Sequence, residues 1–431
     1  MSYVRQGTLF SFETFVAAHE DNERLVLVLT TLPDERVLSY LGRKRKRPHE
    51  PDPSVVMWRC LIAKYVYQIT TYAELIRELK RNGSPRWLVG IEHLEQVPAD
   101  YDFSRLLAKL AAPAGLALLA EMFELGVSQL TAQLPQLGEH LAVDATAVHA
   151  YSNELRQDKS DPDAAWSARP KRQRRRSGGR VEEHLAYWFG YQLHLIVDCA
   201  TELPVAFEVT AANENETTRF EPLLEQLAHE QAALAARTKA VIADAGYDST
   251  ANCRYVLSEW QALPVIKMRL TQKKQDRDQP FAGATSLCNE LGTQLCDSGH
   301  KMVYAGRDGN YLKWRCPVAR GKAERCTAFG RCSASAYGTV RKISIWEDPR
   351  RFPGLARESK KWTRLYRKRT AAERVNARLK DFLLLDDLTI RGIEKVTLHA
   401  SVGLLVLLAG AQAMVTAEQW ERVRQVVRLA A

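Results

Sequence analysis

The stretch HLAVDATAVHA, residues 140–150, places one acidic residue inside a run of small and aliphatic side chains. Aliphatic residues alternate with others along it, which is the period of a β-strand. Asp144 stands in the middle of the stretch, so the pattern predicts a strand that carries a carboxylate at the centre of a sheet. A single aspartate in a strand is more often a hydrogen-bonded structural residue than a ligand. A functional role for Asp144 therefore depends on other acidic residues that the fold brings to the same place.

The segments after this strand predict a mixed α/β arrangement. Two further strands are separated by a tight turn at Thr201 to Pro204, and helices then alternate with short apolar strands. The expected elements, in chain order, are strands over 186–200 and 202–213, a helix over 216–237, a strand within 239–249, a helix over 251–260 and a strand over 262–270. Three strands followed by helix, strand, helix and strand is an uncommon order. It resembles the order in ribonuclease-H-like nucleases, whose first strand, fourth strand and a later helix each supply a carboxylate.

In that layout the second and third carboxylates are Asp244 and Glu373. Asp244 directly ends an apolar strand, the position at which ligands emerge from a sheet. Asp198 and Asp248 lie nearby, and we interpret both as turn residues. Glu373 belongs to YRKRTAAERVNARLK, residues 366–380, which has the period of a helix.

The helix predicted over 366–380 has one charged side and one apolar side. At about 100° per residue, four side chains project from it within about 60° of one another: Tyr366, Arg369, Glu373 and Lys380. The opposite side is suited to packing on a core: Ala372, Val375, Leu379 and Phe382. An ordinary surface helix with solvated charges has the same pattern. The functional alternative is a helix that holds a metal ion through its carboxylate and phosphates through its cations.

The charge balance indicates a polyanionic partner. Lys and Arg number 61 against 51 Asp and Glu, and the isoelectric point is near 9.1. Nucleic acid fits this balance better than a membrane, because basic patches gain affinity by releasing counterions from phosphates. The most basic run is SARPKRQRRRSGGR, residues 167–180, which we interpret as an exposed loop that contacts DNA. Its candidate phosphate-binding residues are Arg172, Arg174, Arg175 and Arg176.

Two further features bear on location. The amino terminus lacks the cationic start and apolar core of a secretory signal, so we expect an intracellular protein. Residues 396–415 approach the length of a membrane span, but they contain His399, Ser401 and Gln412 and lack aromatic residues at their ends. We therefore predict a buried core helix there and no membrane partner.

Two regions flank the predicted sheet. The first 130 residues are mostly helical, and within them 53–83 predicts two helices joined at 68–70 and closed by Gly83. Such a pair is either a helix-turn-helix that reads DNA or a plain helical hairpin. The second region, 271–345, is rich in Gly, Cys, Lys and Arg with little periodicity, and we interpret it as an insertion.

Five of the eight cysteines fall within the insertion. Four of them, with or without His300, form a possible zinc site: Cys296, Cys316, Cys326 and Cys332. No two of the cysteines are separated by only two residues, as they are in a typical zinc ribbon. The spacing therefore favours reduced thiols without a metal.

The three acidic residues suit metal-assisted chemistry on a phosphodiester. Such chemistry needs an activated oxygen nucleophile and stabilisation of the departing oxygen, which two divalent ions about 3.5–4 Å apart provide together. Mg²⁺ takes oxygen ligands, and carboxylates are what a protein must offer it. We expect Asp144 to bridge both ions, with Asp244 and Glu373 on either side. Because the three like charges repel, the site should be poorly organised without metal.

The same residues resemble the aspartate-aspartate-glutamate (DDE) transposases of bacterial insertion sequences. The chain carries the Tyr, Arg, Glu, Lys signature of one large group of them, with gaps of two, three and six residues, at Tyr366, Arg369, Glu373 and Lys380. AVDATAV around Asp144 and IADAGYDS around Asp244 are also similar to that family. The resemblance covers most of the chain from about 55 to 410.

The resemblance implies cut-and-paste movement of a DNA element. In that family Mg²⁺ or Mn²⁺ is held by the carboxylates, water attacks the end of the element, and the freed 3′-hydroxyl attacks target DNA. It also implies that Tyr366, Arg369 and Lys380 contact phosphates beside a flipped base. An aromatic residue commonly stacks on such a base, and Trp314 and Trp362 are both candidates.

These features together predict the organisation and partners of the chain. We expect a helical DNA-binding domain over 1–130, a ribonuclease-H-like catalytic core over 131–270 and 346–431, and the cysteine-rich insertion over 271–345 between its two parts. The expected partners are double-stranded DNA at the element ends and at the target, and a second copy of the chain in a synaptic complex. The expected location is the bacterial cytoplasm with the nucleoid. The alternatives are a nuclease of the same fold without strand transfer, and a catalytically idle DNA-binding descendant of a transposase.

Overall fold

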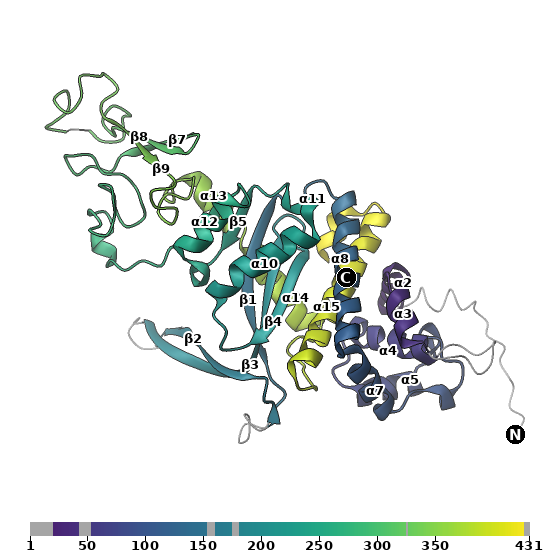
Figure 1. Ribbon diagram of the computed structural model, residues 1–431. Coiled ribbons are helices and arrows are strands. Elements are labelled where there is room, and N and C mark those ends of the chain that lie inside the picture. The colour runs from purple at the N-terminus through teal and green to yellow at the C-terminus, as the bar shows by residue number, and fades with distance from the viewer. Residues whose placement is uncertain (1–19, 43–52, 153–159, 175–180, 325, 426–431) are drawn as a thin grey trace, which may run out of the picture.

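A mixed β-sheet lies at the centre of the protein and helices flank it (Figure 1). The computed structural model describes residues 20–42, 53–152, 160–174, 181–324 and 326–425. The central strands are β1 (His140–His149), β2 (Ala165–Arg174), β3 (Val181–Asp198), β4 (Pro204–Ala211), β5 (Ala240–Ala243) and β6 (Leu263–Ile266). The alternating aliphatic residues of 140–149 form β1 as predicted.

The strand order is that of a ribonuclease-H-like sheet. β3 pairs antiparallel with both β1 and β4, while β5 pairs parallel with β1 and with β6. The order across the sheet is therefore β4, β3, β1, β5, β6, with β1 in the middle. The fold class predicted from the sequence is confirmed.

β2 was not predicted. The basic run was interpreted as a loop from residue 167, but residues 165–174 form a strand that pairs with the first half of β3. β3 is long enough to pair with β1 along one half and with β2 along the other, and the two partners meet at Gly190. A side chain at Gly190 would lie 2.1 Å from the carbonyl oxygen of Val148, so the point at which β3 exchanges β2 for β1 as its partner requires glycine. The resulting β2–β3 hairpin extends away from the body of the protein (Figure 1).

Helices fill the amino-terminal part of the described chain. They are α2 (Glu20–Thr31), α3 (Glu35–Leu41), α4 (Pro53–Val66), α5 (Tyr72–Arg81), α6 (Gly83–Leu88), α7 (Asp100–Leu110) and α8 (Pro113–Gln133). α4 and α5 are the predicted pair, and the hydroxyl of Thr71 accepts a hydrogen bond from the backbone of Glu74 at 3.2 Å to begin α5. The prediction that Gly83 closes the pair is wrong: Asn82 ends α5, and its side chain caps α6, which Gly83 begins. The proposed domain boundaries stay predictions.

The remaining helices pack on the sheet or on one another. They are α10 (Glu216–Glu230), α11 (Ala232–Ala235), α12 (Thr250–Ser258), α13 (Lys360–Arg367), α14 (Thr370–Phe382) and α15 (Ile393–Thr416). The helix predicted over 216–237 is divided at Gln231 into α10 and α11. The side-chain amide of Gln231 donates a hydrogen bond to the carbonyl of Glu124 on α8. α14 lies against β1 and β3, and α10 lies against β3 and β4.

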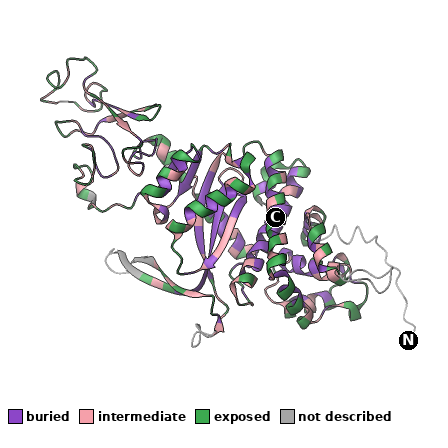
Figure 2. Ribbon diagram, viewed as in Figure 1, coloured by how far each residue is buried: buried purple, intermediate pink, exposed green. Residues whose placement is uncertain are grey.

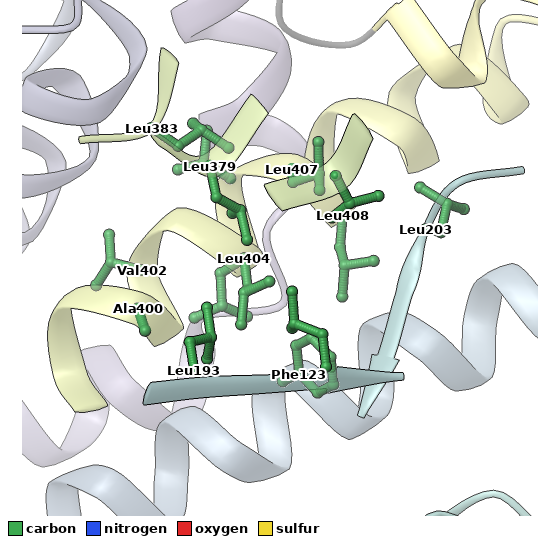
Figure 3. Packing of buried hydrophobic residues seen from close by; sticks show 14 of the residues in the cluster. Phe123, Leu193, Leu203, Leu379, Leu383, Ala400, Val402, Leu404, Leu407 and Leu408 are labelled. Atoms are coloured by element: carbon green, nitrogen blue, oxygen red, sulfur yellow. The ribbon is translucent and has the colours of Figure 1, made fainter. Parts of the chain in front are cut away.

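α15 joins the helical part and the sheet into one core. It contacts α2, α4 and α8 as well as β4, and its middle is buried along every side (Figure 2). Close up, its leucines Leu404, Leu407 and Leu408 lie among Phe123 of α8 and Leu193 of β3 (Figure 3). It is the one helix of the described chain long and apolar enough to span a membrane, and 94% of that apolar stretch is buried inside the protein. The predicted buried core helix is therefore present.

The insertion contains a small sheet that its sequence did not reveal. β7 (Val303–Asp308), β8 (Tyr311–Arg315) and β9 (Val340–Ser344) pair antiparallel, and the region projects from the edge of the main body beyond α12 and α13 (Figure 1). Its core is small and includes Cys288, Leu312, Trp314 and Phe352. Only part of 271–345 is thus organised by strands.

Leu404 tests the role of α15. Its side chain has no exposed surface, so Leu404→Ala should lower the free energy of unfolding by about 3 kcal/mol through lost burial and a cavity. Leu125→Ala on α8 is the control, because that leucine is 46% exposed and should cost well under 1 kcal/mol. Urea denaturation followed by circular dichroism measures both. Equal effects of the two changes would show that α15 is not a core helix.

Candidate active site

The parallel pairing of β1 and β5 brings two aspartates together. Val143 lies opposite Ala243 in that pairing, so the next residues, Asp144 and Asp244, are neighbours where β5 ends. Asp144 points away from bulk solvent, with 15% of its side chain exposed. Asp244 begins a short turn, and its Oδ1 accepts a hydrogen bond from the backbone of Gly246 at 2.6 Å.

Glu373 of α14 is linked to Asp144 through Arg369. Its Oε1 lies 2.5 Å from Nη2 of Arg369, and Nη1 of the same guanidinium lies 3.9 Å from Oδ1 of Asp144. α14 also supplies Asn376, whose side-chain amide donates to Oδ2 of Asp144 at 2.9 Å. One arginine therefore stands between two of the three predicted carboxylates, and 49% of the Glu373 side chain remains exposed.

The helix predicted over 366–380 is broken at residues 368 and 369. Tyr366 ends up near the end of α13, Arg369 precedes α14, and the backbones of Lys368 and Arg369 each bond to a carbonyl three residues earlier. That tighter turn replaces the continuous helix that the pattern predicted. The predicted apolar side is nonetheless present on α14, where Ala372, Val375 and Leu379 are buried and Phe382 is partly buried.

Two signature side chains have defined contacts. The ring of Tyr366 stacks on that of Trp362 with centroids 5.0 Å apart and an angle of 7° between the planes. The ammonium of Lys380 donates to the carbonyl of Ala147 on β1 at 2.7 Å and to Asp386 at 2.9 Å. Trp314, the other aromatic candidate, is 2% exposed inside the insertion. Of the two tryptophans, Trp362 is therefore the one beside the candidate site.

Asp198 and Asp248 have structural contacts, as interpreted from the sequence. The carboxylate of Asp198 is wholly buried and accepts hydrogen bonds from the backbones of Gly138, Ala200 and Thr201 at 2.7–2.9 Å. Asp248 is paired with Arg350 at 2.7 Å. Both carboxylates therefore stabilise turns through these contacts.

Glu216 is an acidic residue of this site that the sequence analysis missed. It begins α10, and a side chain built at Gly246 would lie 2.5 Å from its Oε2 and 2.8 Å from Oδ1 of Asp244. Its Oε1 pairs with Arg169 of β2 at 3.0 Å. The sequence could have indicated Glu216 by its position, because it begins the helix that follows the third strand of the predicted core.

Burial and mutual repulsion dominate the electrostatics. Burial raises the pKa of Asp144 to about 7, and the charges of Asp244 and Glu216 add to the rise while Arg369 and Arg169 oppose it. Burial also raises the pKa of Glu216. The arginines therefore compensate only part of the negative charge that these carboxylates carry when ionised.

The donor set fits a hard divalent cation. All candidate ligands are carboxylate oxygens, which Mg²⁺ and Mn²⁺ prefer, and Oδ1 of the buried Asn376 has no hydrogen-bond partner. Across the described ranges, no three His, Cys, Asp or Glu side chains are close enough to hold one ion as they stand.

The structure describes the backbone of two of the four arginines predicted to contact DNA from the basic run. Arg172 and Arg174 belong to β2, in the projecting hairpin, while Arg175 and Arg176 lie outside the described residues. The four candidate zinc ligands are all in the insertion.

Two family models match the chain. Residues 135–409 match the family described as "Transposase DDE domain", and residues 13–109 match a second family described as a transposase domain. A solved structure of the piggyBac transposase synaptic complex with hairpin DNA is similar at a TM-score of 0.39 and 9% identity, over 94% of this chain and 79% of that one. The comparison with curated proteins finds no match.

Two aspartates on neighbouring parts of the sheet should respond oppositely to neutralisation. Asp198→Ala should lower the free energy of unfolding by about 3 kcal/mol, because it leaves several buried donors unpaired. Asp144→Asn should keep or raise stability at pH 8 in a chelator, since it removes a charge that burial disfavours. The difference in stability between Asp144→Asn and the parent should vanish near pH 3, where the parent carboxyl is protonated in both the folded and the unfolded state. Urea titrations at the two pH values measure this, and a strongly destabilising Asp144→Asn at pH 8 would contradict it.

Proposed function

Because the chain belongs to the DDE transposases of the insertion-sequence type, as the match over 135–409 shows, we propose that it cuts the ends of its own DNA element and joins them to a target. The proposal assigns the chemistry to Asp144, Asp244 and Glu373. The observation that supports it is the register of β1 and β5, which sets Asp144 beside Asp244, with Arg369 linking Asp144 to Glu373 of α14.

Asp144, Asp244 and Glu373 are the residues that would hold the divalent ions. The chemistry that two bound Mg²⁺ or Mn²⁺ ions supply at such a site is activation of the attacking oxygen and neutralisation of charge on the departing one. Asn376 holds the carboxylate of Asp144 in one orientation. Glu216, tied to Arg169, adds negative charge beside Asp244 and so favours occupancy by cations.

Arg369 has two roles in this proposal. In the protein alone it spans Asp144 and Glu373, which reduces the repulsion between the carboxylates. With divalent ions bound, the carboxylates would no longer need this guanidinium, which would then be free to bind a phosphate of the DNA, for which its paired donors are suited. Tyr366 lies beside it, with the guanidinium 5.9 Å from the ring centroid.

The stacked pair Trp362 and Tyr366 is the proposed aromatic platform for an unpaired base at the element end. Planar aromatic surfaces stack on any base, so the platform would bind the base without sequence preference. Lys380 is the second proposed phosphate contact, and its bond to the carbonyl of Ala147 fixes it next to β1.

The β2–β3 hairpin is the proposed arm for DNA outside the active site. It projects from the body and its sequence from 171 to 176 is dominated by Lys and Arg. The amino-terminal helices are the proposed domain for the terminal inverted repeats, and a homodimer would hold two ends in one synaptic complex.

Glu373→Gln tests the assignment of the chemistry. The change keeps the size of the side chain and removes its charge, so cleavage of DNA carrying the element ends should fall by about 10³-fold or more in Mg²⁺. Binding of that DNA should remain. Asp381→Asn, an exposed acidic residue on the same helix, should cleave as the parent does. Gel assays of cutting, and of joining to a second DNA, measure both steps.

The outcomes of that assay separate the alternatives. Cutting without joining by the parent would indicate a nuclease of the same fold. If the parent binds this DNA but neither cuts nor joins it with Mg²⁺ or with Mn²⁺, the result would indicate an idle DNA-binding protein.

Arg172 and Arg174 test the role of the hairpin. Replacing both with Ala should weaken DNA binding and lower the slope of log K against log salt by about two, since each phosphate contact contributes about 0.9. Arg422→Ala with Arg424→Ala, two exposed arginines after α15, makes a comparison of equal charge change outside both proposed DNA-binding regions. Filter binding at several salt concentrations gives the slopes. An unchanged slope in the hairpin variant would remove the hairpin from the DNA interface.

A further inference from the structure

Sulfur ligands from separate segments gather in the insertion. One small cavity of about 10 Å³ is lined by four cysteines and a histidine: Cys296, His300, Cys316, Cys326 and Cys332. These residues come from a turn before β7, from the end of β8 and from the long segment between β8 and β9. The sequence spacing favoured unliganded thiols, but the fold brings together groups that the spacing left apart.

Backbone hydrogen bonds fix the turns that carry these residues. In the first turn the backbone of Cys296 donates to the carbonyl of His300 at 3.0 Å, and that of Gly299 donates to Cys296 at 2.8 Å. Cys316 follows β8 and its backbone donates to the carbonyl of Thr339 at 3.0 Å. Gly338 passes so close that a side chain there would lie 2.6 Å from Cβ of Cys316. Two sides of the cavity are thus held in place.

The third side is the turn between Cys326 and Cys332. The backbone of Phe329 donates to the carbonyl of Cys326 at 3.1 Å, and that of Cys332 donates to Ala328 at 3.0 Å. Both cysteines of this turn line the cavity. All four cysteines are free thiols in the structure.

Little else holds the segment between β8 and β9. Residues 316–339 contain neither helix nor strand among those described, and the described ones make no salt bridge. Two of its aromatic side chains, Phe329 and Tyr337, are 44% and 73% exposed. A small region without a sufficient apolar core needs a cross-link, and in chains without disulfides that cross-link is commonly a metal ion.

We propose that Cys296, Cys316, Cys326 and Cys332 bind one structural Zn²⁺ in a tetrahedral site. Four thiolates are the donor set that Zn²⁺ takes in closed, non-catalytic sites. Binding exchanges four S–H bonds for four Zn–S bonds and releases four protons, with no change of oxidation state. As they stand, the sulfur atoms are not gathered closely enough to hold an ion, so the turns close slightly around it. His300 lines the same cavity and is the alternative fourth ligand.

This site is separate from the carboxylate site in both chemistry and position. Soft sulfur ligands select zinc, whereas the carboxylates select Mg²⁺ or Mn²⁺. The zinc would stabilise the segment after β8, which holds Arg320, Lys322 and Arg331.

Metal analysis of the purified full chain tests the proposal. Protein prepared without chelators should contain about one zinc ion per chain by inductively coupled plasma mass spectrometry. Cys316→Ser and Cys326→Ser should each lose the zinc, while Cys199→Ser, a cysteine in the turn after β3, should keep it. His300→Ala should keep it if all four ligands are sulfur. Glu373→Gln should also keep it, which separates this test from that of the proposed catalytic site.

Thiol accessibility supplies a readout that does not depend on folding of the variants. In the parent, four thiols should be protected from maleimide and become reactive when a zinc chelator is added, with mass spectrometry mapping them to the insertion. Replacement of zinc by Co²⁺ should give the visible bands of a tetrahedral thiolate site. Parent protein that holds no zinc, takes up neither Zn²⁺ nor Co²⁺ after reduction, and has the four thiols reactive from the start would overturn the proposal.

Discussion

The carboxylate of Asp144 inside the sheet is the constraint around which the rest of the protein is arranged. β1 is the central strand, and α14 packs over it, so that only 15% of the Asp144 side chain is exposed. Burial of that charge is unfavourable and raises its pKa to about 7. The contacts of Asn376 and Arg369 offset part of this cost from a helix that is far away in sequence. The sheet and α14 must therefore form together for the site to exist.

The fold separates the candidate site from the β2–β3 hairpin and from the insertion. α15 packs against the amino-terminal helices and the sheet, so the two regions share one core. The hairpin and the insertion leave this core at its margins (Figure 1). The hairpin proposed to contact DNA can then extend from the body without disturbing the register that pairs Asp144 with Asp244. The same separation would let the proposed zinc site and the proposed carboxylate site exist in one chain.

The central fold and three of its acidic residues followed from sequence because their signals are local. Aliphatic alternation marks β1, and the apolar run before Asp244 marks β5. Three features were beyond such signals. β2 is rich in charge and is a strand only because the first half of β3 pairs with it. The break between α13 and α14 lies within an unbroken helical pattern, and Glu216 joins the site only through the position of Gly246.

The central claim is that Asp144, Asp244 and Glu373 converge on a pair of divalent ions. The most direct test is anomalous X-ray diffraction at the manganese edge from crystals of the protein bound to DNA of the element end, grown with Mn²⁺ and a blocked nucleophile. The account predicts two manganese peaks about 3.5–4 Å apart between the three carboxylates, with Arg369 moved onto a phosphate. Manganese bound elsewhere, or Arg369 still joined to Glu373 with DNA in place, would contradict it.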